Sequence, residues 1–251
     1  MIRCLLLVMT LGCGTAVEAI PEDFESFAAG DAPAGPWTAT GEMSVTEARS
    51  FGGRQSLHLQ PGANWEGRAL IGRTDIPDGL RRAHHGRAMF YVPEVSADGV
   101  HWNMLTVGGR SQMDDVWRGD PFDASLSYGG MHQKSWLANF DTPGGYDGEG
   151  PRSDCWQDSR VAFPENRWVC VEWHVDADAA EMRLWVDGDA VSAMTVRGEG
   201  DGCVAPWAGD SWAFPDFQSL ELGWVEFGDD AAPRELWLDD VAFGSKRVGC
   251  P

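Results

Sequence analysis

The sequence predicts an all-β protein, an antiparallel β-sandwich of the jelly-roll type. Over Trp168–Asp176, apolar and polar side chains alternate with a period of two, and Glu181–Asp187 repeats the pattern after a short gap. Such alternation indicates strands with one buried face, and the gap fits a hairpin. The chain also contains 31 glycines and 14 prolines, which recur at the spacing of sandwich turns. About a dozen strands in two sheets follow from this pattern.

The order of the expected strands follows from where the period-two patterns begin and end. Two longer stretches, Ser111–Asp123 and Asp141–Pro164, lack such a pattern and are expected to be irregular loops. Loops of that length carry function or are tied down, here by Cys155. The expected strands lie near 22–27, 43–47, 55–60, 67–72, 86–92, 100–107, 124–130, 134–140, 168–176, 181–187, 190–196, 218–227 and 235–243.

Residues 1–19 are expected to form an export signal peptide. Arg3 precedes a short apolar run, Cys4–Leu11, and small residues around Ala19 suit cleavage by signal peptidase. The run is too short to cross a membrane. We therefore expect a secreted or periplasmic protein whose residues 20–251 form a single jelly-roll domain.

A lipid anchor is the alternative reading of the N-terminal region. Leu11-Gly12-Cys13 partly resembles a lipoprotein cleavage box, but Thr10 stands where such boxes prefer leucine. Anchoring through Cys13 is therefore less favoured than plain export.

The net charge restricts the class of partner. The chain has a formal net charge of −20, which argues against nucleic acid because binding to phosphates needs clustered cations. The same charge mildly disfavours a polyanionic substrate, although salt screens the field over ~8 Å and a local cationic cleft can still prevail. We expect a monomer without a transmembrane segment.

The four cysteines that follow the expected export signal predict disulfides. Four cysteines allow three pairings, and we favour Cys155–Cys170 and Cys203–Cys250. The first would close a loop onto the opening hairpin, and the second would fasten the C-terminal tail. Disulfides suit an exported chain. No spacing of cysteines or histidines resembles a zinc site.

Polar side chains gather in two otherwise apolar segments. In Val100–Val107, His101 and Asn103 share one face, and Trp102 lies on the other. The second segment, Ser125–Asn139, crosses a Gly-Gly turn or bulge. If these strands are neighbours, one cleft would collect Arg87, His101, Asn103, Tyr128, His132, Gln133 and Lys134, with Trp102, Trp136 and Asn139 as further substrate contacts.

That set of side chains suits β-elimination on a uronic-acid polysaccharide. A base, Tyr128 or His101, would take the proton next to the sugar carboxylate, and a tyrosine can also protonate the leaving oxygen. Arg87 and Gln133 would neutralise the carboxylate while enolate-like charge develops. Tyr91 and Tyr146 are alternative tyrosines. The competing interpretation is a polar ligand-binding surface with no chemistry.

Hydrolysis is less favoured. Glycosidases need two carboxyl groups facing each other across the bond, and sandwich hydrolases of the retaining type carry an E-x-D-x-x-E strand. Glu221-Leu-Gly-Trp-Val-Glu226 has the wrong alternation for that pattern. Serine catalysis is disfavoured as well, because the chain has no Gly-x-Ser-x-Gly elbow.

The thirteen tryptophans admit two interpretations. Some tryptophans would be exposed as flat platforms for sugar rings, and the candidates at strand or loop positions of a concave face are Trp102, Trp117, Trp136 and Trp224. For any single tryptophan, burial in the core is the favoured interpretation, because aromatic side chains dominate cores.

Carboxylates near both ends of the chain suggest a calcium site. Glu25 lies near the expected first strand, and Asp239 and Asp240 lie in the expected last strand. First and last strands often pair in jelly rolls. Together with carbonyls of the glycine turn Ser50–Arg54, these carboxylates would make an oxygen cage suited to a structural Ca²⁺. The alternative is an acidic, solvated edge.

Three stretches carry a resemblance to a known family. Asp23–Ser26 and Leu236–Gly244 resemble the first and last strands of secreted concanavalin A-like jelly rolls. Trp168–Trp173 and Leu184–Gly188 are similar to bacterial relatives of the fungal cellulose-induced protein family, whose core domain resembles glucuronan and alginate lyases.

The resemblance implies a secreted sandwich with a glycan cleft, a structural Ca²⁺ near the terminal strands, and lyase activity on polyuronides. By the same analogy Arg87, His101, Tyr128 and Gln133 would be the catalytic residues. The chain departs from the alginate lyases in two respects. No glutamine stands two residues before His101, and the late strand that carries a Tyr-x-x-x-x-Tyr pattern in those enzymes reads Leu222-Gly-Trp-Val-Glu-Phe227 here.

Overall fold

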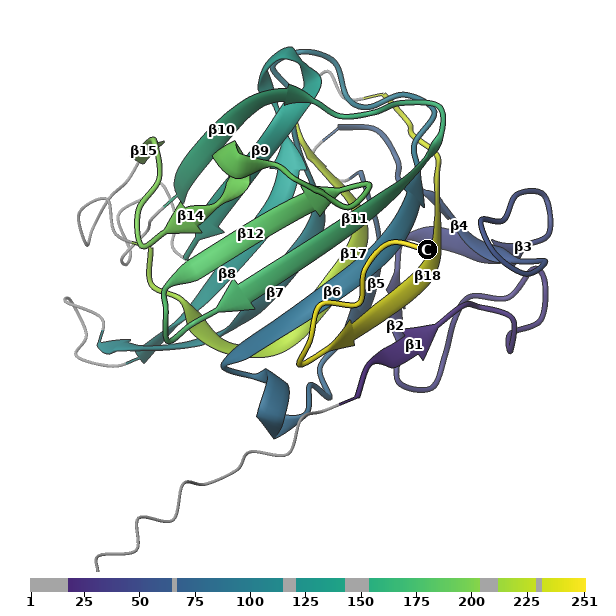
Figure 1. The fold of residues 1–251 in the computed structure, drawn as a ribbon. Helices are drawn as coiled ribbons and strands as arrows, with labels where there is room; N and C mark the ends of the chain where they lie inside the picture. The colour runs from purple at the N-terminus through teal and green to yellow at the C-terminus, as the bar shows by residue number, and fades with distance from the viewer. Residues whose placement is uncertain (1–17, 65–66, 115–120, 143–153, 204–211, 229–231) are drawn as a thin grey trace, which may run out of the picture.

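The computed structural model describes residues 18–64, 67–114, 121–142, 154–203, 212–228 and 232–251. Two antiparallel sheets, one of nine strands and one of eight, pack face to face as two layers (Figure 1). This arrangement confirms the predicted all-β jelly-roll fold. The apolar face of each sheet is turned toward the other, because burying that face is what holds such sandwiches together.

The nine-stranded sheet contains the hairpin predicted from the alternating pattern. Its order is β13-β12-β11-β6-β18-β4-β3, with β1 paired to β18 and β14 paired to β12. The strands are β1 (Ile20–Glu22), β3 (Glu42–Thr46), β4 (Ser56–Gln60), β6 (Ala83–Tyr91), β11 (Trp168–Asp176), β12 (Glu181–Val186), β13 (Asp189–Ala190), β14 (Val196–Arg197) and β18 (Leu236–Gly244).

The eight-stranded sheet has the order β15-β10-β9-β8-β7-β17-β5-β2. Its strands are β2 (Thr38–Thr40), β5 (Arg68–Arg73), β7 (His101–Asp114), β8 (Pro121–Gly130), β9 (Ser135–Asp141), β10 (Asp154–Ala162), β15 (Gly202–Cys203) and β17 (Pro215–Phe227). Short 3₁₀ turns lie at η2 (Asp78–Leu80), η3 (His132–Lys134) and η4 (Ser192–Met194).

Four of the expected elements differ from the structure. The expected first strand, near 22–27, lies earlier, since β1 ends at Glu22 and a turn follows it. Within the expected loop Asp141–Pro164, most of the described residues belong to strand β10. The other expected loop, Ser111–Asp123, is shorter than expected, because β7 extends to Asp114 and β8 begins at Pro121. A strand near 190–196 was expected, but η4 interrupts that stretch. In β10 a bulge lies between Asp158 and Ala162, and the broken alternation hides the strand in the sequence.

The tryptophans of the eight-stranded sheet belong to the core. Trp102 stacks on Trp224 with ring centroids 4.3 Å apart, and Trp136 packs 4.8 Å from Phe163. All three tryptophans are fully buried. The expectation that they form exposed sugar platforms is therefore wrong, and the core interpretation is right. Trp117 lies outside the described residues.

In the nine-stranded sheet, a buried tryptophan requires glycine at the position that faces it on the neighbouring strand. Gly86 of β6 faces Trp173 of β11, and a Cβ at Gly86 would lie 2.0 Å from Trp173 Cζ2. Only a residue without a side chain allows the indole to lie against the neighbouring strand.

The predicted cysteines are disulfide-bonded, but in a different pairing. The bonds join Cys155 to Cys203 and Cys170 to Cys250. The predicted partners Cys155 and Cys170 lie on β10 and β11, which belong to different sheets, whereas β10 and β15 pair with Cys155 directly opposite Cys203. The cysteine pairing therefore depends on which sheet each strand belongs to. The lengths of the loops between the cysteines, on which the prediction relied, do not determine it.

The expected signal peptide, residues 1–19, lies almost entirely outside the described residues. The first strand begins directly after it, and Ile20 pairs with Phe243 of β18. Cleavage after Ala19 would thus leave this strand intact. Among the described residues, no helix has the length and apolar character needed to cross a membrane.

We expect the core residue His84 to make stability depend on pH. Burial lowers the pKa of His84 from 6.5 to about 4. Between these values the unfolded chain binds a proton that the native chain does not, so stability falls as the pH drops through this window, by about 3 kcal/mol for this group. In urea unfolding, His84→Gln should lose less stability than the parent between pH 7 and pH 4.5. Equal losses would contradict this assignment.

Candidate functional site

A row of mostly polar side chains crosses the outer face of the eight-stranded sheet. One cross-strand row runs from Trp156 through Asn139, Ser127 and Thr106 to Glu221, each residue paired with the next on the neighbouring strand. These side chains point away from the core, since each strand alternates between the two faces. The row therefore forms a polar surface across four strands, with the half-buried Trp156 at its β10 end.

Two atoms of this row have no hydrogen-bond partner among the described residues. Ser127 Oγ and Asn139 Oδ1 are shielded from solvent, and neither makes a hydrogen bond with any described residue. The other end of the Asn139 amide, Nδ2, donates to Asp154 at 3.3 Å. Buried polar atoms are nearly always hydrogen-bonded, so this pair marks a place where a ligand or water supplies the missing partner.

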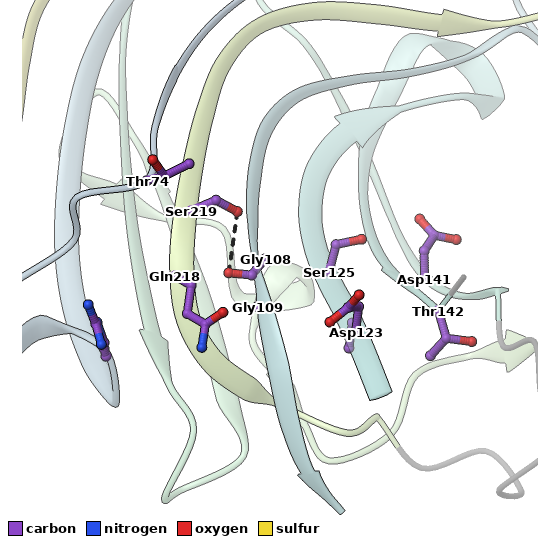
Figure 2. Close-up of a pocket in the computed structure, with 11 residues that line it drawn as sticks. Thr74, Gly108, Gly109, Asp123, Ser125, Asp141, Thr142, Gln218 and Ser219 are labelled. Carbon is purple, nitrogen blue, oxygen red and sulfur yellow. Dashed lines mark hydrogen bonds between the residues drawn. The ribbon is translucent and has the colours of Figure 1, made fainter. Parts of the chain in front are cut away.

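Next to this row lies a groove with a volume of about 830 Å³. Its floor is Gly108 and Gly109 of β7, which carry no side chains, and its walls are formed by β8, β9 and β17 (Figure 2). Gly109 is required there, because a Cβ would lie 1.8 Å from the Asp216 carbonyl oxygen. The lining residues are Thr74, Arg81, Gly108, Gly109, Asp123, Ala124, Ser125, Asp141, Thr142, Gln218 and Ser219.

The groove offers hydroxyl, amide and charged groups at short range. Arg110 Nη1 donates to Asp123 Oδ1 at 3.2 Å beside the groove, and Ser219 Oγ donates to the Gly108 carbonyl at 3.3 Å. On the adjacent row, partial desolvation raises the pKa of Glu221, although the residue as a whole is exposed. Short polar side chains around a bare floor are suited to bind sugar hydroxyls.

His101 and Asn103 form a pair at the other end of this face. His101 Nε2 lies 3.1 Å from Asn103 Oδ1, and the imidazole stacks on Phe227 with centroids 5.0 Å apart. Burial lowers the pKa of His101 to about 4, which outweighs the hydrogen bond to Asn103 that raises it. His101 is therefore neutral at physiological pH and retains one imidazole nitrogen with a free lone pair.

Tyr128 does not lie on this face. The residue is 1% exposed, and its hydroxyl donates to the Met194 carbonyl at 2.8 Å inside the sandwich. Burial raises the pKa of Tyr128 well above 10. The role expected for Tyr128, as a base that contacts substrate, is inconsistent with this position. Of the two alternatives, Tyr91 lies on the nine-stranded sheet and Tyr146 lies outside the described residues.

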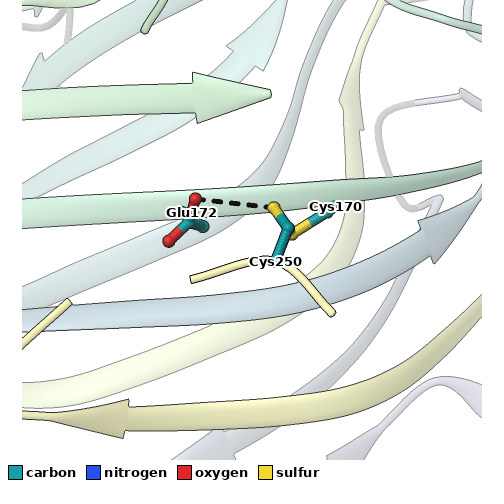
Figure 3. Close-up of side chains that lie close together, drawn as sticks. All are labelled: Cys170, Glu172 and Cys250. Carbon is teal, nitrogen blue, oxygen red and sulfur yellow. Dashed lines mark hydrogen bonds between the residues drawn. A yellow bond between two sulfur atoms is a disulfide. The ribbon is translucent and has the colours of Figure 1, made fainter. Parts of the chain in front are cut away.

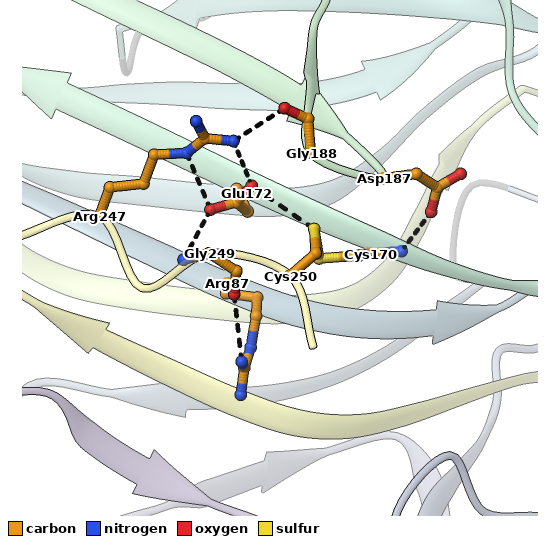
Figure 4. Close-up of polar contacts among 8 residues, drawn as sticks. All are labelled: Arg87, Cys170, Glu172, Asp187, Gly188, Arg247, Gly249 and Cys250. Carbon is orange, nitrogen blue, oxygen red and sulfur yellow. Dashed lines mark hydrogen bonds and ion pairs between the residues drawn. A yellow bond between two sulfur atoms is a disulfide. The ribbon is translucent and has the colours of Figure 1, made fainter.

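Arg87 is also separated from His101. It belongs to β6 of the nine-stranded sheet, where Nε donates to the Asp240 carbonyl at 3.2 Å. Nη1 donates to the Gly249 carbonyl, also at 3.2 Å (Figure 4). The expectation of a cleft shared by Arg87 and His101 is therefore wrong, because their strands are in different sheets. Arg87 instead fastens the C-terminal tail.

The polar residues of η3 lie at the end of the sheet rather than in the groove. His132 and Gln133 are exposed, and the Gln133 backbone N–H donates to Asp98 at 2.6 Å. Lys134 pairs with Glu165 at 3.1 Å, so its charge is already compensated. Of the predicted site residues, His101, Asn103 and Asn139 thus share the outer face, whereas Trp102, Tyr128 and Trp136 face the core.

The groove residues were not predicted from the sequence. Asp123, Ser125 and Gln218 come from strands whose pairing brings them together, and part of the groove borders a stretch expected to be a loop. The detectable signal was the repeat of small and polar residues at Gly108, Gly109 and Ser125, since a strand that lacks bulk on one face leaves room for a ligand.

Two of the three expected calcium ligands converge on one turn, whereas the third, Asp240, has its Oδ2 3.7 Å from Arg87 Nη2. Glu25 Oε1 accepts the N–H groups of Arg54 at 2.5 Å and Gln55 at 2.8 Å, and Asp239 Oδ2 accepts those of Phe51 at 2.8 Å and Gly52 at 3.1 Å. Asp239 is 1% exposed and pairs with no lysine or arginine among the described residues. Burial raises its pKa to about 6.

A third cluster superficially resembles a metal site. Cys170, Glu172 and Cys250 are the only metal-like grouping of side chains in the described part of the chain, but the two sulfurs are bonded to each other (Figure 3). Glu172 Oε1 and Oε2 accept from Arg247 at 3.0 and 2.6 Å, and Oε1 also accepts from the Gly249 N–H (Figure 4). We call this cluster the tail clamp, since it holds the C-terminal tail on β11.

This chain is similar to one known protein family and to several solved structures. The family model described as Polysacc_lyase-like, Cip1-like core domain, matches residues 154–246. A cellulose-induced protein, Cip1, is 21% identical with a TM-score of 0.60, and the match covers 92% of this chain and 100% of that one. No curated protein matches the chain.

Two lyase structures share the fold. The endo-β-1,4-glucuronan lyase of the fungus Trichoderma reesei is 11% identical with a TM-score of 0.55, covering 90% of this chain and 95% of that one. The alginate lyase vAL-1 from a Chlorella virus is 13% identical with a TM-score of 0.52, covering 84% and 93% respectively. At these identities the likeness shows a common fold.

Proposed function

Since the chain is related to the Cip1-like core-domain family, we propose that it binds a polysaccharide along the outer face of its eight-stranded sheet and cleaves uronic-acid chains there by β-elimination. The observation that carries this proposal is the polar face itself, with its groove and with the unpaired Ser127 Oγ and Asn139 Oδ1. An extended sugar chain supplies alternating hydroxyls that match such a surface.

The His101–Asn103 pair supplies the chemistry. With Asn103 Oδ1 accepting from Nε2–H, the neutral imidazole presents its Nδ1 lone pair as a base. Nδ1 takes the proton on C5 of a uronate, the C4–O bond breaks as the C4=C5 double bond forms, and the imidazolium returns the proton to the leaving oxygen. The Asn103 amide N–H donates to the sugar carboxylate and stabilises the enolate-like charge.

The activity should depend on His101 and on pH in a defined way. His101→Ala should lower turnover of glucuronan or alginate by about 100-fold or more, followed as ultraviolet absorbance of the unsaturated product. Because the pKa of His101 is about 4, kcat/KM should be flat at neutral pH and fall only as the pH approaches that value. His174→Gln, on the opposite sheet, is the matched control and should retain activity. Full activity of His101→Ala would exclude this base.

A non-catalytic carbohydrate-binding protein is the second candidate. It is favoured by the burial of Tyr128, which removes the expected proton donor, and by the carboxylates Asp123 and Asp141 beside the groove. The two functions differ in one readout. Retained glycan binding, with no unsaturated product from any uronate polymer, would establish binding alone.

We also propose a structural Ca²⁺ held by Glu25 and Asp239 at the Ser50–Arg54 turn. The support is the buried Asp239 carboxylate, which has no cationic partner among the described residues. Carboxylate oxygens are the ligands that a hard cation such as Ca²⁺ prefers. Its binding free energy would add to folding stability. A chelator should lower the melting temperature by several degrees, and excess Ca²⁺ should restore it. An unchanged melt would remove the proposal.

Export to a periplasmic or extracellular compartment belongs to the same proposal. Two disulfides suit an oxidising compartment, and the polymers named above lie outside cells. Peptide mapping of the protein from its native host should find Ile20 at the N-terminus.

A further inference from the structure

A row of aromatic rings crosses the outer face of the nine-stranded sheet, on the side of the molecule opposite the groove. His58 of β4 pairs with Trp237 of β18, Trp237 with Tyr91 of β6, and Tyr91 with Trp168 of β11. Neighbouring strands lie about 4.8 Å apart, so the row is a platform about 14 Å long. The four strands lie next to one another in Figure 1.

The rings contact one another along this row. His58 stacks on Trp237 with centroids 4.4 Å apart, and Tyr91 lies 5.8 Å from both Trp237 and Trp168. Phe51, from the glycine turn, packs edge-on against Trp168 at 5.9 Å. Phe51 is 38% exposed and is one of only two large hydrophobic side chains that the described part of the chain leaves exposed. The Phe51 ring therefore continues the row beyond Trp168.

Arg49 lies over this row without a carboxylate. Its guanidinium carbon is 3.7 Å from the centroid of Tyr91 and 4.6 Å from that of Trp237. Nε is shielded from solvent and has no hydrogen-bond partner, and no acidic residue of the described chain pairs with this arginine. In a protein of net charge −20, an arginine without an acidic partner is unusual, because carboxylates are abundant. We call Arg49, Phe51, His58, Tyr91, Trp168 and Trp237 the aromatic patch.

We propose that the aromatic patch is a binding site for an acidic saccharide, with a sugar carboxylate on Arg49 and sugar rings stacked on the half-buried ring of Trp168 and the exposed ring of Phe51. A guanidinium held flat by aromatic neighbours keeps its fork of N–H donors oriented for a carboxylate. Asn166, which accepts the Tyr91 hydroxyl at 2.6 Å, adds an exposed amide at the rim. The site lies on the other sheet from His101, and this inference does not rest on the proposed cleavage.

The global charge of the protein strengthens the choice of ligand. The net charge of −20 creates a field that repels an acidic chain. Binding of such a chain at this surface therefore requires a local cation. Arg49 is the cation that the patch provides. Contact between two ions also predicts that the affinity falls as salt is added, because screening shortens the range of the attraction.

The test is a calorimetric titration with a β-1,4-linked tetramer of glucuronic acid, compared with cellotetraose, the neutral tetramer of the same linkage. It is done in the His101→Ala background, so the acidic tetramer stays intact. Arg49→Gln should weaken the binding of the acidic tetramer at the patch by about tenfold or more, a factor that corresponds to about 1.4 kcal/mol. Arg160→Gln, which removes an exposed arginine from the other sheet, should leave that binding unchanged.

A measurement without an Arg49 substitution keeps the proposal falsifiable if Arg49→Gln does not fold. The indole N–H signals of Trp168 and Trp237 should shift when the acidic tetramer is added, and the shifts should shrink at high salt. Unmoved indole signals, an affinity that Arg49→Gln leaves unchanged, or equal binding of cellotetraose would overturn the proposal. Absence of lyase activity would not affect it, so the two proposals fail separately.

Discussion

Replacing Arg247 with alanine is expected to lower the free energy of unfolding by about 3 kcal/mol, because a buried carboxylate loses the one cation that pairs with it in the described part of the chain. Glu172 is 0% exposed, and Arg247 donates two hydrogen bonds to it, at 3.0 and 2.6 Å. Breaking a buried pair costs about 3–5 kcal/mol. The Arg247 side chain is 40% exposed, so water can partly replace it and the lower end of the range applies.

Urea unfolding of Arg247→Ala measures this loss. Lys246→Ala is the matched control, since it removes the same charge from the adjacent, exposed position of the tail. The control should stay within about 0.5 kcal/mol of the parent, as exposed substitutions do. Equal loss in the two variants would show that the tail responds to net charge, and the tail clamp would not be the cause.

The double replacement Cys170→Ser and Cys250→Ser is expected to destabilise the protein by about 4 kcal/mol. The bond joins residues 80 apart in sequence, and a cross-link over a long loop removes much of the entropy of the unfolded chain. Replacing both cysteines avoids a free thiol. Among the described residues, the hydrogen bonds of Arg247, Arg87 and the Gly249 N–H would then still hold the tail.

Unfolding of the double variant, compared with Cys155→Ser and Cys203→Ser, tests the pairing. The second bond spans a separation of 48, so its loss should cost slightly less in the loop model. Mapping of disulfide-linked peptides gives the connectivity directly. A Cys155–Cys170 peptide would contradict the structure, because those residues lie on different sheets.

The sequence contains enough information to predict the strands that alternate cleanly. β11 and β12 follow the period-two pattern and pair with Trp173 opposite Leu184, because one apolar face is enough to define a strand and its buried side. β10 escaped prediction because its bulge interrupts the alternation. Membership of a strand in one sheet or the other depends on contacts between distant residues, which is why the cysteine pairing and the position of Arg87 were wrong.

The burial of Tyr128, which was expected to contact substrate, could have been predicted from the alternation of residues along β8. Tyr128 shares its parity on β8 with Phe122, Ala124 and Leu126, all of which are buried, so the alternation itself assigns the tyrosine to the core. His101 and Asn103 were correctly placed on one face by the same rule. The groove needs the register of four strands, and no local pattern contains that information.

The structure of the His101→Ala variant with a bound tetramer of glucuronic acid tests the central claim most directly. We predict a sugar chain across β9, β8, β7 and β17, with hydrogen bonds to Ser127 Oγ and Asn139 Oδ1 and a uronate carboxylate at Asn103. A structure in which this face carries no sugar, at a concentration that saturates binding in solution, would contradict the proposed function.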